Sequence, residues 1–420
     1  MDSSLIYASI ITIGDELLIG QVVDTNSSWM ATELNKAGVW MKRRVAVGDN
    51  KSDIVEALNQ ESSKAQIVLI TGGLGPTADD ITKPVLCEYF GGKLVTDPGA
   101  LQNVQDIFAR LQRPMLAVNL KQAEVPDTCT VIQNKRGTAP GMWFEKEGKI
   151  FVSMPGVPHE MKGMMTDYVI PALQQHFRMP AIVSHTLLTA GIGESFLSEL
   201  IKDFEQSLPP EVKLAYLPNY GMVRLRLTGI SYDVQALQAT AQARFEELKE
   251  QVKEYLVTDR DEPLSHVVAR LLQDAGKTLS TAESCTGGYI AHLITQQSGA
   301  SRHFKGSVVS YDNQVKGEVL HVQQTTLQTV GAVSEETVRE MVQGALAVLK
   351  SDYALAVSGI MGPDGGTPEK PVGTVWVAAG NSQQTITQKF QFRFDRQRNI
   401  ELTANNALNL LRKLIVSEKA

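Results

Sequence analysis

The chain has 420 residues, of which 43% are apolar and 20% charged, as is usual for globular proteins of two or three domains. A net charge of −6 disfavours a general nucleic-acid-coating role. Three widely separated cysteines without a CxxC pair favour a reducing compartment and no structural zinc site. The N-terminal segment lacks the basic region of a signal peptide, and no apolar run is long enough to span a bilayer. We therefore expect a cytoplasmic protein that does not contact a membrane.

The first 170 residues alternate the sequence patterns of strands and helices. The expected strands are 6–14, 39–47 and 66–73, and the expected helix between the first two is 25–38. Ser52 is a candidate N-cap for the next helix, and residues 142–156 read as a hairpin that turns near Gly148. Such alternation predicts a parallel or mixed sheet covered by helices on both faces.

The remainder of the chain divides into two further blocks. In residues 171–257, the segment 223–229 alternates apolar and polar residues like a half-solvated edge strand, and 233–256 reads as an amphipathic helix. Residues 258–420 return to strand and helix alternation. The elements expected there are helices 263–275 and 289–297, a long helix beginning near Ser334, strands 353–359, 374–380 and 388–394, and a closing helix. We expect α/β domains at 1–170 and 258–420, joined by a small α+β domain at 171–257.

Three polar segments follow strands of the first block. In TGGLGPTADD (71–80), glycines allow backbone N–H groups to approach a phosphate at the start of a helix, and two aspartates offer oxygen ligands to a divalent cation. GDELLIGQVVDTNS (14–27) adds further carboxylates, and MPGVPHEM (154–161) ends a third strand. Because ligands bind at strand ends in open α/β sheets, these segments predict a phosphate-and-metal site. The segments match neither a P-loop nor a GxGxxG dinucleotide loop.

A second candidate site surrounds Ser284, which lies where a strand gives way to a helix in STAESCTGGYI (280–290). A serine nucleophile needs a base, and neither His292 nor His303 stands in a recognisable triad or GxSxG elbow. Lys316 is a candidate base if burial lowers its pKa, although a solvated helix lysine is the commoner interpretation. Cys285 is an alternative nucleophile, but it reads more simply as a small buried residue.

Two loops add candidate substrate-binding residues to this site. SGIMGPDGGTPEKPVGTVW (358–376) is long and rich in glycine and proline, which suits a binding loop more than a plain connection. FRFDRQRN (392–399) offers Arg396 and Arg398 beside a helix start, and either guanidinium could pair with a phosphate.

The segments of the first block resemble the N-terminal domain of the competence/damage-inducible CinA family, which has the fold of molybdopterin-binding enzymes. The resemblance implies a metal-dependent pyrophosphatase that acts on ADP-ribose. A divalent cation such as Mg²⁺ would be held by some of Asp15, Glu16, Asp79 and Asp80, with ligand and base not distinguished. The implied phosphate or substrate contacts are Gly72, Gly73, Gly75, Thr77, Asn26, Pro155 and Gly156.

TAESCTGG, SYDNQVK, GAVSEETV and the two loops resemble, in order, the C-terminal domain of the same family, which also occurs alone as a nicotinamide mononucleotide (NMN) deamidase. The resemblance implies cofactor-free hydrolysis of NMN to nicotinate mononucleotide and ammonia, with Ser284 as nucleophile, Lys316 as general base and Tyr311 in the proton relay. The implied substrate-binding residues are Thr286, Gly287, Gly288, Ser358, Gly359 and Arg396, with the helix-start amides as oxyanion donors. Phe394 stands where the family has a glycine, which leaves the choice between Arg396 and Arg398 open.

The middle block resembles the family's KH-like connector. The RNA-clamping element of KH domains is a GXXG loop, whereas AGIGES (190–195) has its glycines two apart. We therefore expect a spacer and a homodimer contact, with NMN and ADP-ribose as substrates and no nucleic-acid partner. Two alternatives stay open: a chain in which only one domain is active, and a non-catalytic regulatory protein linked to competence or DNA damage.

Overall fold

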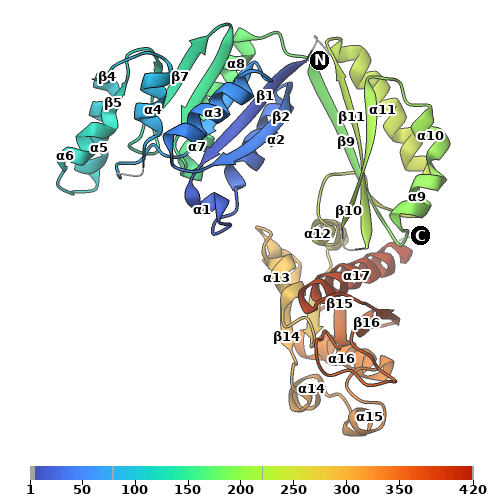
Figure 1. Ribbon diagram of the computed structural model, residues 1–420. Coiled ribbons are helices and arrows are strands. Elements are labelled where there is room, and N and C mark those ends of the chain that lie inside the picture. Colours follow the sequence, from blue (N-terminus) through green and yellow to red (C-terminus); the bar gives the residue numbers. More distant parts are fainter. Residues whose placement is uncertain (1–4, 78–79, 220, 419–420) are drawn as a thin grey trace. The chain divides into compact units, whose positions relative to one another are not determined.

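The computed structural model describes residues 5–77, 80–219 and 221–418. The chain divides into two compact units, residues 1–183 with 229–238, and residues 184–228 with 239–420. Within the described residues, no helix is both long and apolar enough to cross a membrane. Three sheets of four to six strands carry the architecture (Figure 1).

The N-terminal domain is built on a six-stranded sheet in the order β2-β1-β3-β8-β7-β6. Its strands are β1 (Ile6–Ile13), β2 (Val39–Val47), β3 (Ile67–Thr71), β6 (Thr130–Ile132), β7 (Gly141–Lys146) and β8 (Lys149–Met154). Neighbours among β2, β1, β3 and β8 are parallel, and the hairpin β7–β8 and the β6–β7 pair are antiparallel. The carboxyl ends of β1, β3 and β8 therefore meet at one edge of the sheet.

The helices of this domain are α1 (Asp15–Leu18), α2 (Thr25–Lys36), α3 (Lys51–Ser62), α4 (Thr82–Tyr89), α5 (Pro98–Arg110), α6 (Ala117–Leu120), α7 (Pro158–Met164) and α8 (Ile170–His176). Helices α2, α7 and α8 pack on one face of the sheet and α3 and α4 on the other, as strands that are buried on both faces require. Ile10 and Leu69 pack into the core on one face, and Ile11 and Ile70 into the core on the other. A short ribbon of β4 (Leu94–Thr96) and β5 (Glu124–Pro126) flanks the sheet. Helices α5 and α6 lie beside β4 and β5 (Figure 1).

The predicted N-cap of α3 is wrong. The side chain of Asn50, not Ser52, accepts a hydrogen bond from the Asp53 amide, while Ser52 Oγ donates to Asn50. Asn and Ser are about equally good caps, so residue type alone does not separate them.

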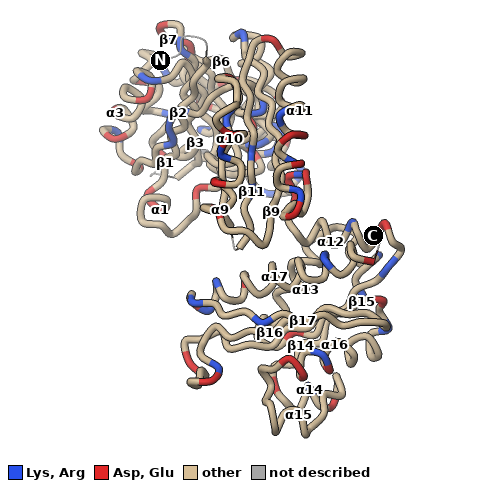
Figure 2. Tube along the Cα trace, turned by 90° about the vertical axis from the view of Figure 1, so that its right-hand side faces the viewer, with Lys and Arg blue, Asp and Glu red and all other residues tan. Residues whose placement is uncertain are grey.

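The middle domain has a four-stranded sheet in the order β10-β11-β9-β12, with strands β9 (Ala181–Ala190), β10 (Val212–Asn219), β11 (Met222–Ser231) and β12 (Leu256–Thr258). Its helices are α9 (Glu194–Leu200), α10 (Lys202–Gln206) and α11 (Val234–Gln251), and α11 carries both basic and acidic residues (Figure 2). The prediction of an edge strand at 223–229 is wrong, because β11 lies between two other strands. The alternation reflects one-sided burial of Val223, Leu225 and Leu227, which does not require an edge position.

The C-terminal domain has a five-stranded sheet in the order β14-β13-β15-β16-β17. Its strands are β13 (Leu279–Glu283), β14 (Phe304–Val309), β15 (Tyr353–Gly359), β16 (Thr374–Asn381) and β17 (Thr385–Gln391), and its helices are α12 (Leu264–Asp274), α13 (Tyr289–Thr295), α14 (Asn313–Leu320), α15 (Gln324–Thr329), α16 (Glu335–Leu349) and α17 (Arg396–Ser417). Strands β14, β13 and β15 are parallel, so their carboxyl ends lie together. Leu355 packs under α12 and α17, and Ala354 and Ala356 face α16. Ser334 caps α16, where the sequence predicts a helix start.

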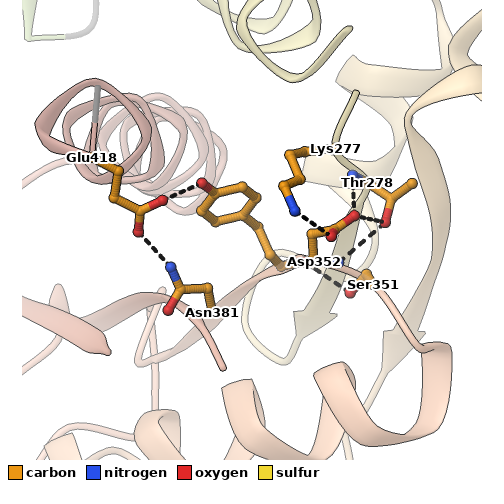
Figure 3. Close-up of polar contacts among 7 residues, drawn as sticks. Lys277, Thr278, Ser351, Asp352, Asn381 and Glu418 are labelled. Atoms are coloured by element: carbon orange, nitrogen blue, oxygen red, sulfur yellow. Dashed lines mark hydrogen bonds and ion pairs between the residues drawn. The ribbon is translucent and has the colours of Figure 1, made fainter. Parts of the chain in front are cut away.

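A polar network fastens the end of α17 to the sheet (Figure 3). Tyr353 Oη and Asn381 Nδ2 both donate to the Glu418 carboxylate. Beside them, Lys277 Nζ lies 3.0 Å from Asp352 Oδ1. Partial burial disfavours ionisation of Asp352, but the hydrogen bonds from Thr278 and the Lys277 ammonium outweigh it and lower the pKa of this carboxyl. These contacts hold one end of α17, whose other end begins at the second candidate site.

Candidate functional sites

A cavity of about 490 Å³ opens at the carboxyl ends of β1, β3 and β8. All three predicted segments contribute to it, as expected for strand ends that meet at one edge. The residues that line it include Gly14, Glu16, Asp24, Asn26, Asp49, Gly72, Gly73, Gly75, Asp80, Gln122, Pro155, Gly156 and Glu160.

Two glycines allow the loop after β3 to lie directly against β1 and the start of α4. Gly72 has φ 114°, and a Cβ added there would stand 2.2 Å from the Ile13 carbonyl oxygen. Gly73 has φ 63°, and its Cβ would stand 2.2 Å from Thr82 Oγ1. Any side chain at either position would push the loop outward, so both glycines are needed for this wall of the cavity.

Asp80 closes the same loop from within. Its carboxylate accepts hydrogen bonds from the backbone amides of Gly75, at 2.8 Å, and Thr77, at 2.9 Å, and from Thr77 Oγ1. The Gly75 and Thr77 amides are thus directed at Asp80 rather than outward to a ligand, and Asp80 acts as a loop clamp in this arrangement. Asp79 lies outside the described residues.

The two other predicted metal ligands that the structure describes, Asp15 and Glu16, differ in their contacts. The backbone amide of Asp15 donates to Asp49 Oδ2 at 3.0 Å, and the Asp49 amide donates to Asp15 Oδ1 at 3.2 Å. Glu16 lines the cavity, and its carboxylate lies over Gly14, where a Cβ would stand 2.6 Å from Oε1. Among the described residues, no group of three or more His, Cys, Asp or Glu side chains is assembled to hold a metal.

Several of the substrate-binding residues predicted at the other strand ends form hydrogen bonds within the protein. Asn26 Nδ2 donates to the Gly156 carbonyl at 2.6 Å, and Thr71 Oγ1 donates to the Pro155 carbonyl at 2.9 Å. The buried Asn26 Oδ1 has no hydrogen-bond partner among the described residues. A buried acceptor without a partner is costly, which suits a site that receives a donor from a ligand.

A second cavity, of about 280 Å³, opens at the carboxyl ends of β13, β14 and β15. It brings together most of the residues predicted for the second site, which come from far apart in the sequence. The residues that line it include Ser284, Cys285, Tyr311, Asn313, Lys316, Ala332, Val333, Ser358, Gly359, Asp364 and Arg396. The predicted residues Thr286, Gly287 and Gly288 are not among the described residues that line it.

Lys316 projects from α14 into the domain and is only 1% exposed. Its ammonium donates to the carbonyls of Ser310, at 2.7 Å, and Tyr311, at 3.4 Å. Burial lowers the pKa of Lys316, although Asp312 and Cys285 act in the opposite direction. This is the environment that a lysine base requires, and it excludes the interpretation of Lys316 as a solvated helix lysine. Within the described part of the chain, no hydrogen bond joins Ser284 Oγ to Lys316.

The two candidate nucleophiles differ in their surroundings. Ser284 follows β13 directly, and its amide donates to the Val357 carbonyl at 3.1 Å. Cys285 packs into the hydrophobic core under α12 and α17. Burial, reinforced by the nearby Glu283 charge, raises the pKa of Cys285 to about 12. The thiol therefore stays protonated at neutral pH, and Ser284 as the nucleophile stays a prediction.

The turn after Ser284 leads directly into α13. Gly287 and Gly288 have φ 60° and 96°, so the chain turns through left-handed backbone before this helix. Within the first turn of α13, the amides of Ile290 and Ala291 donate to the Glu283 carboxylate and are not directed at the cavity. Thr286, Gly287 and Gly288 stay predicted as the amide donors to the substrate.

Arg396 and Arg398 are clearly distinguished. Arg396 lines the cavity, and its guanidinium donates to the Gly362 carbonyl and to Tyr311 Oη, each at 2.9 Å. Arg398 instead stacks over Phe394, with its guanidinium carbon 4.0 Å from the ring centre. Tyr311 is 63% exposed and serves here as an acceptor for Arg396. Arg396 is thus held where it can meet a ligand at the cavity mouth.

One wall of the second cavity is held by its backbone carbonyls. Ser358 Oγ donates to the Ala332 carbonyl at 2.7 Å. Lys370, from the glycine- and proline-rich loop, donates to the carbonyls of Val330, at 2.6 Å, and Val333, at 2.8 Å. The Ser358 hydroxyl proton is therefore engaged, which leaves its oxygen lone pairs as acceptors for a ligand.

Comparison with known proteins places this arrangement in a family. The chain is 44% identical over 414 residues to a CinA-like protein of Cytophaga hutchinsonii, with 99% of each chain covered. It is 42% identical to a CinA-like protein of Flavobacterium psychrophilum, with 97% of this chain and 98% of that protein covered. The chain belongs to the CinA family.

Three family models match successive parts of this CinA-family chain. They are described as a probable molybdopterin binding domain, over residues 9–175, the damage-inducible protein CinA KH domain, over 184–258, and the CinA C-terminal domain, over 261–415. The predicted fold class, two α/β domains joined by a KH-like α+β domain, is confirmed. Among solved structures, a competence/damage inducible protein of Agrobacterium tumefaciens is 37% identical, covers 36% of this chain and 93% of its own, and has a TM-score of 0.36.

Several residues at the two CinA-family sites were not predicted from the sequence. Asp49 lines the first cavity directly after β2, and the strand-end rule would have found it. Glu160 lines it from α7, where Asn134 donates to Oε2 at 2.6 Å and burial nevertheless raises the pKa of the carboxyl. In the second site, Asn313 and Lys370 carry no sequence signal that separates them from ordinary loop residues.

Proposed function

We propose that the C-terminal domain hydrolyses the carboxamide of NMN, giving nicotinate mononucleotide and ammonia. The observation that most supports this is the second cavity, where a serine, a buried lysine and an arginine face one space. A serine with a neutral amine as base is a known solution for acyl transfer without a histidine triad. The arginine suits the 5′-phosphate, which is the only strongly anionic group of NMN.

In the proposed reaction, Lys316 in its neutral form takes the proton of Ser284 Oγ as that oxygen bonds to the carboxamide carbon. The C–N bond then breaks, the nitrogen takes the proton from Lys316 and leaves as ammonia, and a nicotinoyl ester remains on Ser284. A water molecule attacks the ester carbon while Lys316 takes its proton. The ester C–O bond breaks, and Ser284 Oγ regains the proton from Lys316. Nicotinate mononucleotide forms as the carboxylic acid, releases its remaining proton to solvent and leaves as the carboxylate.

Ser358 and Arg396 position the substrate in this scheme. Because the Ser358 hydroxyl donates to Ala332, its oxygen accepts a hydrogen bond from the carboxamide N–H₂ and orients the group toward Ser284. Arg396 is held by Tyr311 and Gly362, so little side-chain freedom is lost when it binds a phosphate.

Arg396→Met is expected to raise KM for NMN by about 30-fold while kcat changes less than about threefold, since the phosphate is remote from the reacting bond. Arg398→Met is the matched control and is expected to leave both constants within about twofold, because Arg398 stacks on Phe394. Steady-state ammonia release measures both. A larger effect on KM in the Arg398 variant would assign the phosphate to that residue instead.

We also propose that the N-terminal domain hydrolyses ADP-ribose to AMP and ribose 5-phosphate with a divalent cation such as Mg²⁺. The carboxylates at the first cavity are hard oxygen donors, and Mg²⁺ is typically bound by one or two carboxylates together with substrate phosphates. Glu16 is the best-placed ligand. Asp80 would be a second ligand after its carboxylate releases the hydrogen bonds from the Gly75 and Thr77 amides. When bound, the cation would neutralise the negative charge of the diphosphate and make a bound water molecule more acidic. Asn26 Oδ1 is placed to accept a hydrogen bond from a ribose hydroxyl.

Chelation with EDTA is expected to abolish AMP release from ADP-ribose, and added Mg²⁺ to restore it. Glu16→Gln is expected to lower this activity by about 100-fold without changing NMN hydrolysis. Both readouts use the full chain, with AMP followed by chromatography and ammonia by a coupled assay. Undiminished AMP release in the Glu16 variant would remove Glu16 from the metal site.

The two activities are separable, so each alternative has a distinct outcome. Ammonia release without AMP release, or the reverse, would indicate one active domain. A chain that performs neither reaction but binds DNA at physiological ionic strength, with the salt dependence of phosphate contacts, would support the regulatory role instead.

A further inference from the structure

The last residue of β13, Glu283, is a completely buried carboxylate beside the proposed nucleophile. Its side chain accepts five hydrogen bonds from four parts of the domain. Oε2 accepts from Thr286 Oγ1 at 2.7 Å and from the Ile290 amide at 3.0 Å, and Oε1 accepts from the Ala291 amide at 2.8 Å, Thr281 Oγ1 at 3.2 Å and Ser307 Oγ at 3.5 Å.

Such a residue is expensive in a hydrophobic interior. A buried carboxylate is stable only when donors replace the lost water, and here no lysine, arginine or histidine of the described residues forms an ion pair with Glu283. Backbone amides and hydroxyls supply the donors instead. An apolar residue would fill this position at a lower desolvation cost, so we infer that the local structure needs the hydrogen bonds that the carboxylate accepts.

That requirement lies in the turn that carries Ser284. Thr286 belongs to the turn itself, whereas Ile290 and Ala291 lie in the first turn of α13, which begins at Tyr289. One carboxylate therefore connects the middle of the segment 284–288 to the start of the helix that follows it. Within this segment the Gly287 amide donates to the Ser284 carbonyl at 3.2 Å, and the Tyr289 amide donates to the Thr286 carbonyl at 3.0 Å.

We propose that Glu283 is a positioning residue for Ser284, and that its hydrogen bonds to Thr286 and α13 fix the direction of the serine hydroxyl toward the cavity. This inference rests on the proposed function. Glu283 is not among the described residues that line the cavity, so it acts through the turn and not as an acid or base on the substrate. Misplacement of a nucleophile by about 1 Å costs on the order of 100-fold in rate, which sets the scale of the effect.

The test compares four variants of the full chain. Glu283→Gln keeps the shape but places an amide group against backbone donors, and Thr286→Val removes the one donor that belongs to the turn. Thr281→Val removes a donor to the same carboxylate from within β13, and Thr295→Val is a control on the exposed face of α13, where its hydroxyl contacts only helix carbonyls. The readouts are kcat and KM for NMN, the rate at which a fluorophosphonate probe labels Ser284, and the thermal midpoint.

We expect Glu283→Gln to lower both kcat and the labelling rate by about 100-fold and Thr286→Val by about tenfold, with KM within about twofold. Thr281→Val is expected to lose less than about threefold, and Thr295→Val to match the wild type. If the Glu283 variant fails to fold, the contrast between Thr286→Val and Thr281→Val decides the matter. Equal losses in those two variants, or losses that follow the thermal midpoint alone, would overturn the positioning role.

The probe also separates this inference from the proposed reaction. A wild-type chain that is labelled at Ser284 but releases no ammonia from NMN would refute the deamidase assignment. The ratios of labelling rates among the variants would still support or overturn the role of Glu283.

Discussion

Replacing Ser284 with alanine is expected to lower kcat for ammonia release from NMN by at least about 1,000-fold, because it removes the oxygen that would carry the proposed acyl intermediate. Cys285→Ala, the adjacent control, is expected to keep kcat within about threefold. The Cys285 thiol is buried in the core and stays protonated at neutral pH, so its removal creates a small packing defect and costs about 1 kcal/mol of stability.

The measurement is single-turnover and steady-state ammonia release, with mass spectrometry of the intact chain to detect the nicotinoyl ester. The ester is expected on the wild-type chain and on Cys285→Ala but not on Ser284→Ala. An ester that survives the Ser284 substitution, or activity that disappears with Cys285, would transfer the nucleophile role to the cysteine.

Lys316→Met is expected to lower kcat/KM for NMN by about 100- to 10,000-fold, the usual contribution of a general base. Only the neutral amine can accept the serine proton, so the wild-type rate should rise with pH through the pKa of Lys316. Burial places that midpoint below the ordinary lysine value of 10.5. The rising limb should be absent in Lys316→Met and in Lys316→Arg, since a guanidinium stays protonated.

The lowered pKa of Lys316 also determines whether the free energy of unfolding rises or falls with pH. The unfolded chain holds the Lys316 proton up to about pH 10.5, whereas the folded chain releases it at lower pH. Between the two values the unfolded state binds more protons, so the stability of the wild type relative to Lys316→Met should rise with pH. Denaturant titrations at several pH values measure this. A wild-type pH–rate limb that persists in Lys316→Met would show that another group is the base.

Much of this architecture could be predicted because strands and helices carry local patterns. The runs at 6–14 and 66–73 are mostly apolar, and they become β1 and β3 with cores on both faces. The predictions failed where a sequence pattern shows which residues are buried but not which strands lie next to each other. The alternation over 223–229 correctly indicates one buried face, yet it cannot reveal that β10 pairs with the far side of β11.

The candidate sites could likewise be predicted only in part. Strand ends that are far apart in the sequence could be gathered from topology, which is why Ser284, Lys316 and Arg396 line one cavity as expected. What the sequence could not reveal is how donors and acceptors pair. Asp80 was expected among the candidate metal ligands, and nothing in the sequence indicated that its carboxylate also accepts hydrogen bonds within its own loop. Nor did the sequence indicate that Glu283 accepts the amides of Ile290 and Ala291, because a buried side chain competes with any ligand for the same donors.

The burial of Cys285 has a further meaning for the conditions under which the protein can work. Burial also raises the pKa of Cys87, and it raises that of Cys129 to about 11, so all three thiols are held in their protonated form near neutral pH. Peroxides and disulfides react with thiolates rather than with thiols. The proposed hydrolysis uses an alcohol oxygen and an amine, and the thiols of the chain are held protonated, so we expect this activity to persist under oxidation that inactivates enzymes built on a cysteine nucleophile.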